Sequence, residues 1–226
     1  MHEAKFGSHF GECGFLVEKK QTTRSHRFGG ASWRLVDDDP LCGGPTLLLV
    51  LDLTDPALRD VVVPPELDEL PLCSYVNALV WAERQRYQVN QQTRTVALVE
   101  RESESRDCLD PEDCFPNPLQ EVPVSLVSMG AEDLPTDEQH YWAACEEFVG
   151  GRHFIRVLGS PLWLEQPHLE VCRCADEMKY LAAIGTECYD QPSGILPGQA
   201  FFIGEGALYF FWCAKCSELS VISQAT

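Results

Sequence analysis

An internal repeat constrains the fold more than any other feature of this chain. Residues 28–33 read FGGASW, and residues 158–163 read LGSPLW. A cysteine follows each stretch at the same distance, Cys42 in the first copy and Cys172 in the second. The two copies are 130 positions apart, and the match needs no gap. Self-similarity at a fixed spacing indicates a duplicated structural unit. The sequence therefore predicts two similar halves, and the differences between them point to gained or lost function.

The hydrophobic pattern predicts a mainly β fold of the α+β class. Residues 46–53 form a continuous apolar run of strand length, which is typical of a central strand. A hairpin is predicted over residues 200–212, with Gly204 and Gly206 in its turn. A helix is predicted over residues 136–148, where apolar side chains recur at helical spacing. We therefore expect two similar antiparallel β repeats that form a pseudo-symmetric sheet or sandwich, with one or two helices.

The repeat divides the chain into three segments. Residues 1–100 hold the first, degenerate repeat, and residues 136–226 hold the second repeat. Residues 101–135 are predicted to form an acidic, proline-bearing connection between them. No apolar run is long enough to span a membrane, and the N-terminus lacks the cationic and apolar regions of a secretory signal. We therefore expect a cytoplasmic protein.

Charge is the second strong indication of function. The chain of 226 residues carries a formal net charge of −18. Direct binding of nucleic acid is disfavoured, because phosphate groups are bound by lysine and arginine. A field of this sign attracts a basic partner and speeds its capture. The alternative is a charge that serves only solubility.

The negative charge is concentrated between residues 100 and 147. This stretch contains 14 acidic residues against two arginines, a net charge of −12. Prolines and apolar residues interrupt it, which is more typical of an interaction loop than of a solvated tail. The predicted contacts to a basic partner lie there and in an acidic turn of the first repeat: Asp37, Asp38, Asp39, Glu100, Glu102, Glu104, Asp107, Asp110, Glu112 and Asp113.

Two cysteine pairs in the second repeat predict a metal site. They are Cys172-x-Cys174 and Cys213-x-x-Cys216, separated by about 40 residues. Structural zinc needs four convergent thiolate or imidazole ligands, and two pairs on two loops supply them. Four cysteine ligands leave no open position, so a catalytic metal is disfavoured. We therefore expect one structural zinc.

The first copy lacks this set of ligands. It retains only Cys42, and the other three positions are occupied by Gly44, Arg84 and Tyr87. Any metal therefore belongs to the second half alone. The alternatives are four reduced thiols, the remnant of a lost site, or a thiol-redox pair in which Lys215 lowers a thiol pKa. The redox alternative is disfavoured because such pairs open a helix, whereas this one follows a predicted hairpin.

The remaining cysteines are expected to be reduced. The count of eleven is odd, and secreted disulfide scaffolds are usually shorter and use an even number. Cys108 and Cys114 are expected to stay unbonded in a reducing compartment. Five others are interpreted as small buried apolar residues: Cys13, Cys42, Cys73, Cys145 and Cys188.

No pattern of catalytic residues stands out. The hydrolase, zinc-protease and phosphate-loop motifs are all missing from the sequence. Six histidines are scattered along the chain and are interpreted as surface or structural residues. We therefore do not expect an enzyme.

The second repeat resembles the YwqG-like family of bacterial proteins of unknown function. The resemblance rests on LGSPLW at 158–163, CRCADEMKYL at 172–181 and FFWCAKC at 210–216. It covers about 70 residues well and the first half only weakly. The resemblance implies a duplicated β protein, and many members of the family look like immunity proteins encoded beside polymorphic toxins. This chain departs from the family pattern by its Cys-x-Cys pair and its degenerate first copy.

Two hypotheses of function follow. The first is an immunity protein that binds and inhibits a bacterial toxin, a basic nuclease domain, through its acidic surfaces. The second is a metal-binding or thiol-redox protein that uses the C-terminal cysteine pairs. A third interpretation is a soluble scaffold whose charge only keeps it in solution.

Overall fold

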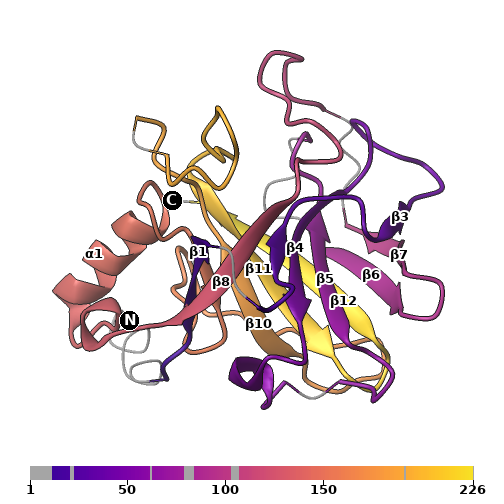
Figure 1. The fold of residues 1–226 in the computed structure, drawn as a ribbon, viewed down its shortest axis with the longest axis horizontal. Helices are drawn as coiled ribbons and strands as arrows, with labels where there is room; N and C mark the ends of the chain where they lie inside the picture. The colour runs from indigo at the N-terminus through magenta and orange to yellow at the C-terminus, as the bar shows by residue number, and fades with distance from the viewer. Residues whose placement is uncertain are drawn as a thin grey trace.

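Figure 1 shows the fold of the computed structural model, which describes residues 12–20, 23–61, 63–78, 84–102, 107–190 and 192–225. Within these residues the chain forms twelve strands, two short 3-10 helices and one α-helix. The fold is therefore mainly β, as the hydrophobic pattern predicts.

The first half of the chain contains β1 (Phe15–Lys19), β2 (Arg27–Phe28), β3 (Arg34–Val36), β4 (Thr46–Asp52), β5 (Glu69–Ser74), β6 (Gln85–Asn90) and β7 (Thr95–Arg101). The second half contains β8 (Val122–Ser128), β9 (Ile155–Val157), β10 (Lys179–Ile184), β11 (Gly206–Cys213) and β12 (Glu218–Ala225). The 3-10 helix η2 (Pro56–Leu58) follows β4, while η3 (Ala131–Asp133) and helix α1 (Glu138–Phe148) lie between β8 and β9.

All these strands belong to one sheet. Its order is β3-β7-β6-β12-β11-β10-β9-β1-β8-β2-β4-β5. Neighbouring strands are antiparallel, except β3 and β7, which are parallel. The predicted antiparallel sheet is thus confirmed, with one parallel pair at its edge.

The β1–β8 pair joins the two halves, with seven strands on one side of it and three on the other. β1 pairs with β8 on one side and with β9 of the second half on the other. β8 pairs in turn with β2 of the first half. Each half therefore contributes its first strand to the other half. The two repeats form one unit rather than two separable domains, and the predicted connection at 101–135 contains the central strand β8.

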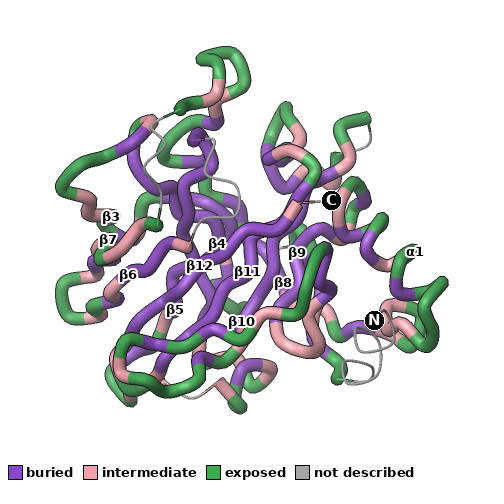
Figure 2. The backbone as a smooth tube through the Cα atoms, turned by 180° about the vertical axis from the view of Figure 1, so that it is seen from behind, coloured by how far each residue is buried: buried purple, intermediate pink, exposed green. Residues whose placement is uncertain are grey.

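The two halves also share one hydrophobic core. In Figure 1, β4 and β5 cross in front of β11 and β12. Side chains from both pairs of strands belong to a single buried cluster, which includes Leu49 and Leu72 from the first half and Phe210 and Val221 from the second. Figure 2 shows the buried strands in the centre of the molecule and exposed segments around them. The apolar runs form strands that are buried on both faces. This explains why apolar and polar residues do not alternate along their sequences.

Helix α1 lies within a segment that the first half lacks. It begins after Asp137, whose carboxylate accepts a hydrogen bond from the backbone N–H of His140. Its buried side chains are Tyr141, Cys145 and Phe148, which pack in a second cluster. The predicted helix is confirmed, although it begins at Glu138 rather than at residue 136. No helix among the described residues is long and apolar enough to cross a membrane.

The hairpin predicted over residues 200–212 is wrong. β11 pairs with β10 and β12, and residues 200–203 form no strand. The backbone N–H of Phe201 instead donates a hydrogen bond of 2.8 Å to the buried carboxylate of Glu187. The Glu187 side chain thus satisfies a backbone group that a neighbouring strand would otherwise bind. The hydrophobic pattern of residues 200–212 gives no sign of this distant contact.

The shared core predicts one cooperative unfolding transition. Leu49 in β4 and Ile184 in β10 are both fully buried in the same cluster. We expect Leu49→Ala and Ile184→Ala each to lower the free energy of unfolding by about 3 kcal/mol, because each leaves a cavity. Urea unfolding followed by circular dichroism and tryptophan fluorescence should show both variants shifting the same transition.

The control is Leu169→Ala, because Leu169 is 64% exposed. We expect this variant to change the free energy of unfolding by less than about 0.5 kcal/mol. Two separate transitions, each moved by only one of the core variants, would contradict the shared core.

Candidate metal centre

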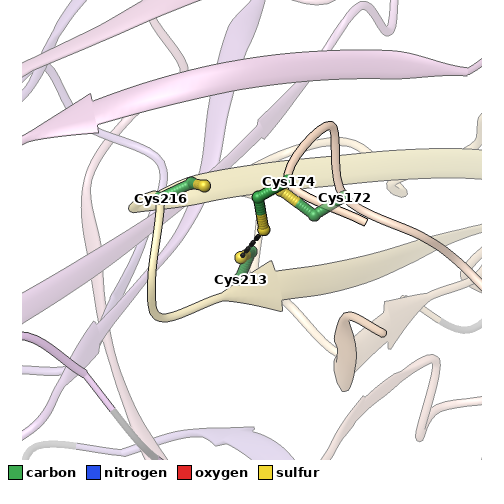
Figure 3. A group of neighbouring side chains, drawn as sticks. All are labelled: Cys172, Cys174, Cys213 and Cys216. Carbon is green, nitrogen blue, oxygen red and sulfur yellow. Dashed lines mark hydrogen bonds between the residues drawn. The ribbon is translucent and has the colours of Figure 1, made fainter. Parts of the chain in front are cut away.

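The four cysteines of the second repeat converge at one point. The sulfur atoms of Cys172, Cys174, Cys213 and Cys216 all lie within 4.8 Å of one another. Figure 3 shows the first pair on a loop and the second pair at the end of β11 and in the turn that follows. The two pairs are about 40 residues apart in the sequence, and the fold brings them together. The predicted set of ligands is thus assembled in space.

The first pair sits on a tight turn before β10. The backbone N–H of Cys172 is donated to the carbonyl of Asp176 at 2.9 Å, and Val171 forms a bridge with Glu177. Ala175 takes a positive φ of 67°, a conformation that closes this turn between the two bridging residues. Because the chain reverses immediately after Cys174, the short Cys-x-Cys spacing still brings both thiols to the same side of the turn.

The second pair sits on the turn between β11 and β12. Cys213 is the last residue of β11 and faces Glu218, the first residue of β12. Cys216 lies in the turn between them, and its carbonyl accepts a hydrogen bond from the side chain of Gln88 at 2.7 Å. Lys215 pairs with Asp176 at 3.1 Å and so links the two turns. The pair lies between two strands, without the helix N-terminus that activates thioredoxin-like thiols.

The distances and burial suit a tetrahedral ion. Zinc with sulfur ligands at about 2.3 Å holds those sulfur atoms about 3.8 Å apart. The sulfur atoms of Cys174 and Cys213 are 3.8 Å apart. Burial raises the pKa of the Cys172 thiol, whereas the backbone N–H of Asp176 lowers the pKa of the Cys174 thiol. A cation among the sulfur atoms would stabilise all four thiolates. The group can therefore hold a metal ion.

Sequence reasoning missed a buried ionic network beside the cysteines. The thiol of Cys172 lies 3.6 Å from the carboxylate of Glu218, which is fully buried. Arg86, on β6 of the first half, lies 3.6 Å from Glu218 and donates to Glu170 at 2.9 Å. Arg173 donates to the other oxygen of Glu218 at 2.6 Å. The positive charges of these arginines would partly compensate the negative charge of four thiolates.

Glu170 is the second anion of this network. Its carboxylate is 1% exposed and accepts hydrogen bonds from Arg86, from Ser220 at 3.0 Å and from His168 at 2.7 Å. Arg84 approaches it at 3.1 Å. Buried carboxylates are tolerated only when cations and donors surround them. The network therefore fixes the loop that carries the first cysteine pair against β6 and β12.

The first copy uses its matching positions differently. Arg84 joins the network around Glu170, and the hydroxyl of Tyr87 donates to Gln85 at 2.6 Å. Gly44 lies in a turn with a positive φ of 85°. Among the described residues of the first half no second cysteine cluster forms. Arg84, which stands where Cys213 stands in the other copy, thus supports the metal centre instead of forming one.

Cys42 and Cys108 form a disulfide, which corrects the expectation that both are reduced. Their Cα atoms are 5.5 Å apart, a separation that permits the bond. Their sequence separation of 66 concealed the pairing, and Cys114 remains a free thiol. Of the other thiols interpreted as buried, Cys73 and Cys145 are buried. Two differ from that interpretation, since Cys13 is exposed and Cys188 is half-buried.

The predicted partner contacts fall into two groups, and Glu104 lies outside the described residues. Three of them contact Tyr75, Arg86 and Arg84 within the molecule: Asp37, Glu100 and Glu102. Six others are exposed: Asp38, Asp39, Asp107, Asp110, Glu112 and Asp113. The Cys42–Cys108 disulfide ties the loop after Asp39 to the loop that begins at Asp107. Two acidic segments that are distant in sequence are therefore held at one end of the sheet.

No protein family, curated protein or solved structure matches this chain. The resemblance of the second repeat to the YwqG-like family therefore stays a prediction, and so does the role that it implies. Function must be argued from the residues of the sites themselves.

The buried network predicts a large cost for losing Arg86. Its side chain is 9% exposed and faces Glu170 and Glu218. We expect Arg86→Met to lower the free energy of unfolding by about 3 kcal/mol, because two carboxylates lose a buried counterion. Urea unfolding at neutral pH measures this loss.

The matched control is Arg59→Met, because Arg59 is 79% exposed and pairs only weakly with Asp60. We expect this variant to change the free energy of unfolding by less than about 0.5 kcal/mol. Equal effects of the two substitutions would show that the network adds nothing beyond a surface ion pair.

Proposed function

We propose that this chain is a non-catalytic binding protein, stabilised by one structural zinc, that captures a basic protein partner through its acidic end. The observation that carries the zinc is the convergence of four cysteine sulfur atoms within 4.8 Å. The observation that carries the partner is the acidic pair of loops joined by the Cys42–Cys108 disulfide. The zinc is part of the scaffold, and the acidic end makes the contact.

The structural role of the zinc follows from where its ligands lie. Two ligands are buried, Cys172 and Cys213, and all four are protein side chains. A site with four protein ligands has no position for substrate. The ion would tie the turn after β11 to the loop before β10, and these two segments close one end of the second half. Its contribution is therefore to folding.

Metal analysis tests the zinc directly. We expect about one zinc per chain after purification without chelator, and a lower melting temperature once a chelator removes it. Cys174→Ser and Cys216→Ser should each lose the metal, since a hydroxyl is a poor zinc ligand. Both side chains are half-buried, so packing losses should be small.

Cys13→Ser is the matched control for this experiment. It also removes a thiol, but from an exposed position outside the cluster. This variant should keep the full zinc content. A metal-free wild-type protein, or zinc retained in both Cys174→Ser and Cys216→Ser, would overturn the structural zinc.

The partner we propose is a basic bacterial toxin, and specifically a nuclease domain that this protein inhibits as an immunity protein. Nuclease surfaces are basic because they bind phosphate, and an acidic inhibitor offers the same sign of charge as their substrate. The net charge of −18 supports this class of partner and disfavours nucleic acid itself. The proposal includes a cytoplasmic location, where such a toxin reaches its substrate, and it therefore requires the Cys42–Cys108 bond to persist in a reducing compartment.

Binding to basic nuclease domains tests this proposal. We expect a complex that weakens as salt rises, because exposed charges are screened. Asp38→Asn/Asp39→Asn and Asp107→Asn/Asp110→Asn should each weaken it about tenfold, through loss of two contacts at the acidic end. Titration calorimetry at two salt concentrations measures both effects.

The control removes two charges elsewhere. Asp60 and Glu66 are exposed and lie in the connection between β4 and β5, which follows the end of β4 remote from Cys42. Asp60→Asn/Glu66→Gln should change the affinity less than either pair at the acidic end. If no salt-sensitive complex forms with any basic nuclease domain, the nuclease partner is excluded.

A further inference from the structure

We propose that a cavity at the acidic end binds an arginine side chain of the basic partner. The cavity lies between residues 109–115, which follow the Cys42–Cys108 disulfide, and residues 189–204, which precede β11. Both loops are at the upper side of Figure 1. This inference rests on the proposed function and specifies which side chain the partner presents.

The cavity is large enough for a side chain from another protein. Its volume is about 620 Å³, and it opens to solvent. Its lining includes the buried apolar side chains of Val76 and Ile203. Such a surface can hold the methylene groups of an arginine while the charged end remains at the rim.

The first wall of the cavity is held in place by a buried amide. Asn77 is 5% exposed, and its side chain donates to the carbonyl of Phe115 at 2.9 Å. The N–H of Phe115 is donated back to the same side chain at 2.7 Å. The carbonyl of Asn77 accepts the N–H of Leu109 at 3.0 Å. Residues 109–115 are thus attached at both ends to one buried residue.

The second wall is held in a matching way by a buried carboxylate. Glu187 is fully buried and accepts the N–H groups of Ser193 and Phe201. The ring of Phe201 stacks on that of Phe115, with centroids 5.1 Å apart. The two walls therefore contact each other at their bases. A cavity with both walls fixed before binding avoids much of the entropy cost of ordering a loop.

The rim has the chemistry of a cation site. Glu112 and Asp113 line the cavity and are exposed, and no lysine or arginine is among its described lining residues. The aromatic side chains of Tyr189 and Phe202 also line it and are 78% and 47% exposed. Carboxylates and aromatic faces together attract a cation more strongly than either alone.

Arginine fits this rim better than lysine. Its planar guanidinium stacks on aromatic rings and donates to carboxylates in a fixed fork, whereas the lysine ammonium is a strongly hydrated point charge. Two carboxylates and two exposed aromatic rings line the same cavity, and these are the partners that a guanidinium uses. We therefore assign Glu112 and Asp113 to the guanidinium, with Tyr189 and Phe202 as the stacking surfaces.

The test uses a small probe, so it does not depend on knowing the partner. N-acetyl-arginine amide is titrated into the full chain and followed by NMR chemical shifts, with N-acetyl-citrulline amide as the neutral probe of equal shape. We expect saturable, millimolar binding of the arginine probe and at least about tenfold weaker binding of the citrulline probe. Glu112→Gln/Asp113→Asn should weaken arginine binding about tenfold, and Tyr189→Ala about threefold.

Asp60→Asn/Glu66→Gln is the control, since it removes the same charge far from the cavity and should leave the probe affinity unchanged. Thermal melts check that each variant is folded. Equal binding of the two probes, no saturable binding, or equal affinity of Glu112→Gln/Asp113→Asn and wild type would overturn the arginine site. A basic nuclease domain that binds this variant as tightly as wild type would overturn the site and leave the acidic-end function standing.

Discussion

The pairing of β1 with β8 is the contact on which the rest of the structure depends. These strands lie at the centre of the order, and each connects the other to the opposite half. Because the halves exchange their first strands, neither can complete its sheet or its core without the other. A duplicated chain that could have formed two small domains, each with a limited core, instead forms one larger core. The loops at the ends of the sheet can then vary without loss of the fold.

Both halves contribute to the surroundings of the four clustered cysteines. All four cysteines come from the second half, yet Arg86 and Arg84 of the first half surround the anions beside them. Of the three positions where the first copy lacks a cysteine, only Arg84 carries a cation that joins this network. The opposite end of the molecule carries the disulfide, the acidic loops and the cavity. The four cysteines and the acidic end proposed to contact a partner are therefore separated in space.

Much of this was predictable from the sequence, and the exceptions have physical reasons. The strand Thr46–Asp52, the helix Glu138–Phe148 and the set of four cysteines follow from apolar runs, helical spacing and paired thiols. The exchange of β1 and β8 does not, because pairing between distant strands leaves no local pattern. Glu187 and Asn77 satisfy backbone groups of distant loops, so the loops that they hold look unstructured in sequence. A charged Glu218 at the start of an apolar strand was the one visible sign of the buried network.

The central claim is that the second half assembles one tetrahedral centre from two turns of the shared sheet. X-ray absorption at the zinc edge of the purified protein tests it most directly. We predict four sulfur neighbours at about 2.3 Å and no oxygen or nitrogen neighbour. A spectrum with fewer than four sulfur neighbours, or with nitrogen or oxygen ligands in their place, would contradict a centre built from Cys172, Cys174, Cys213 and Cys216.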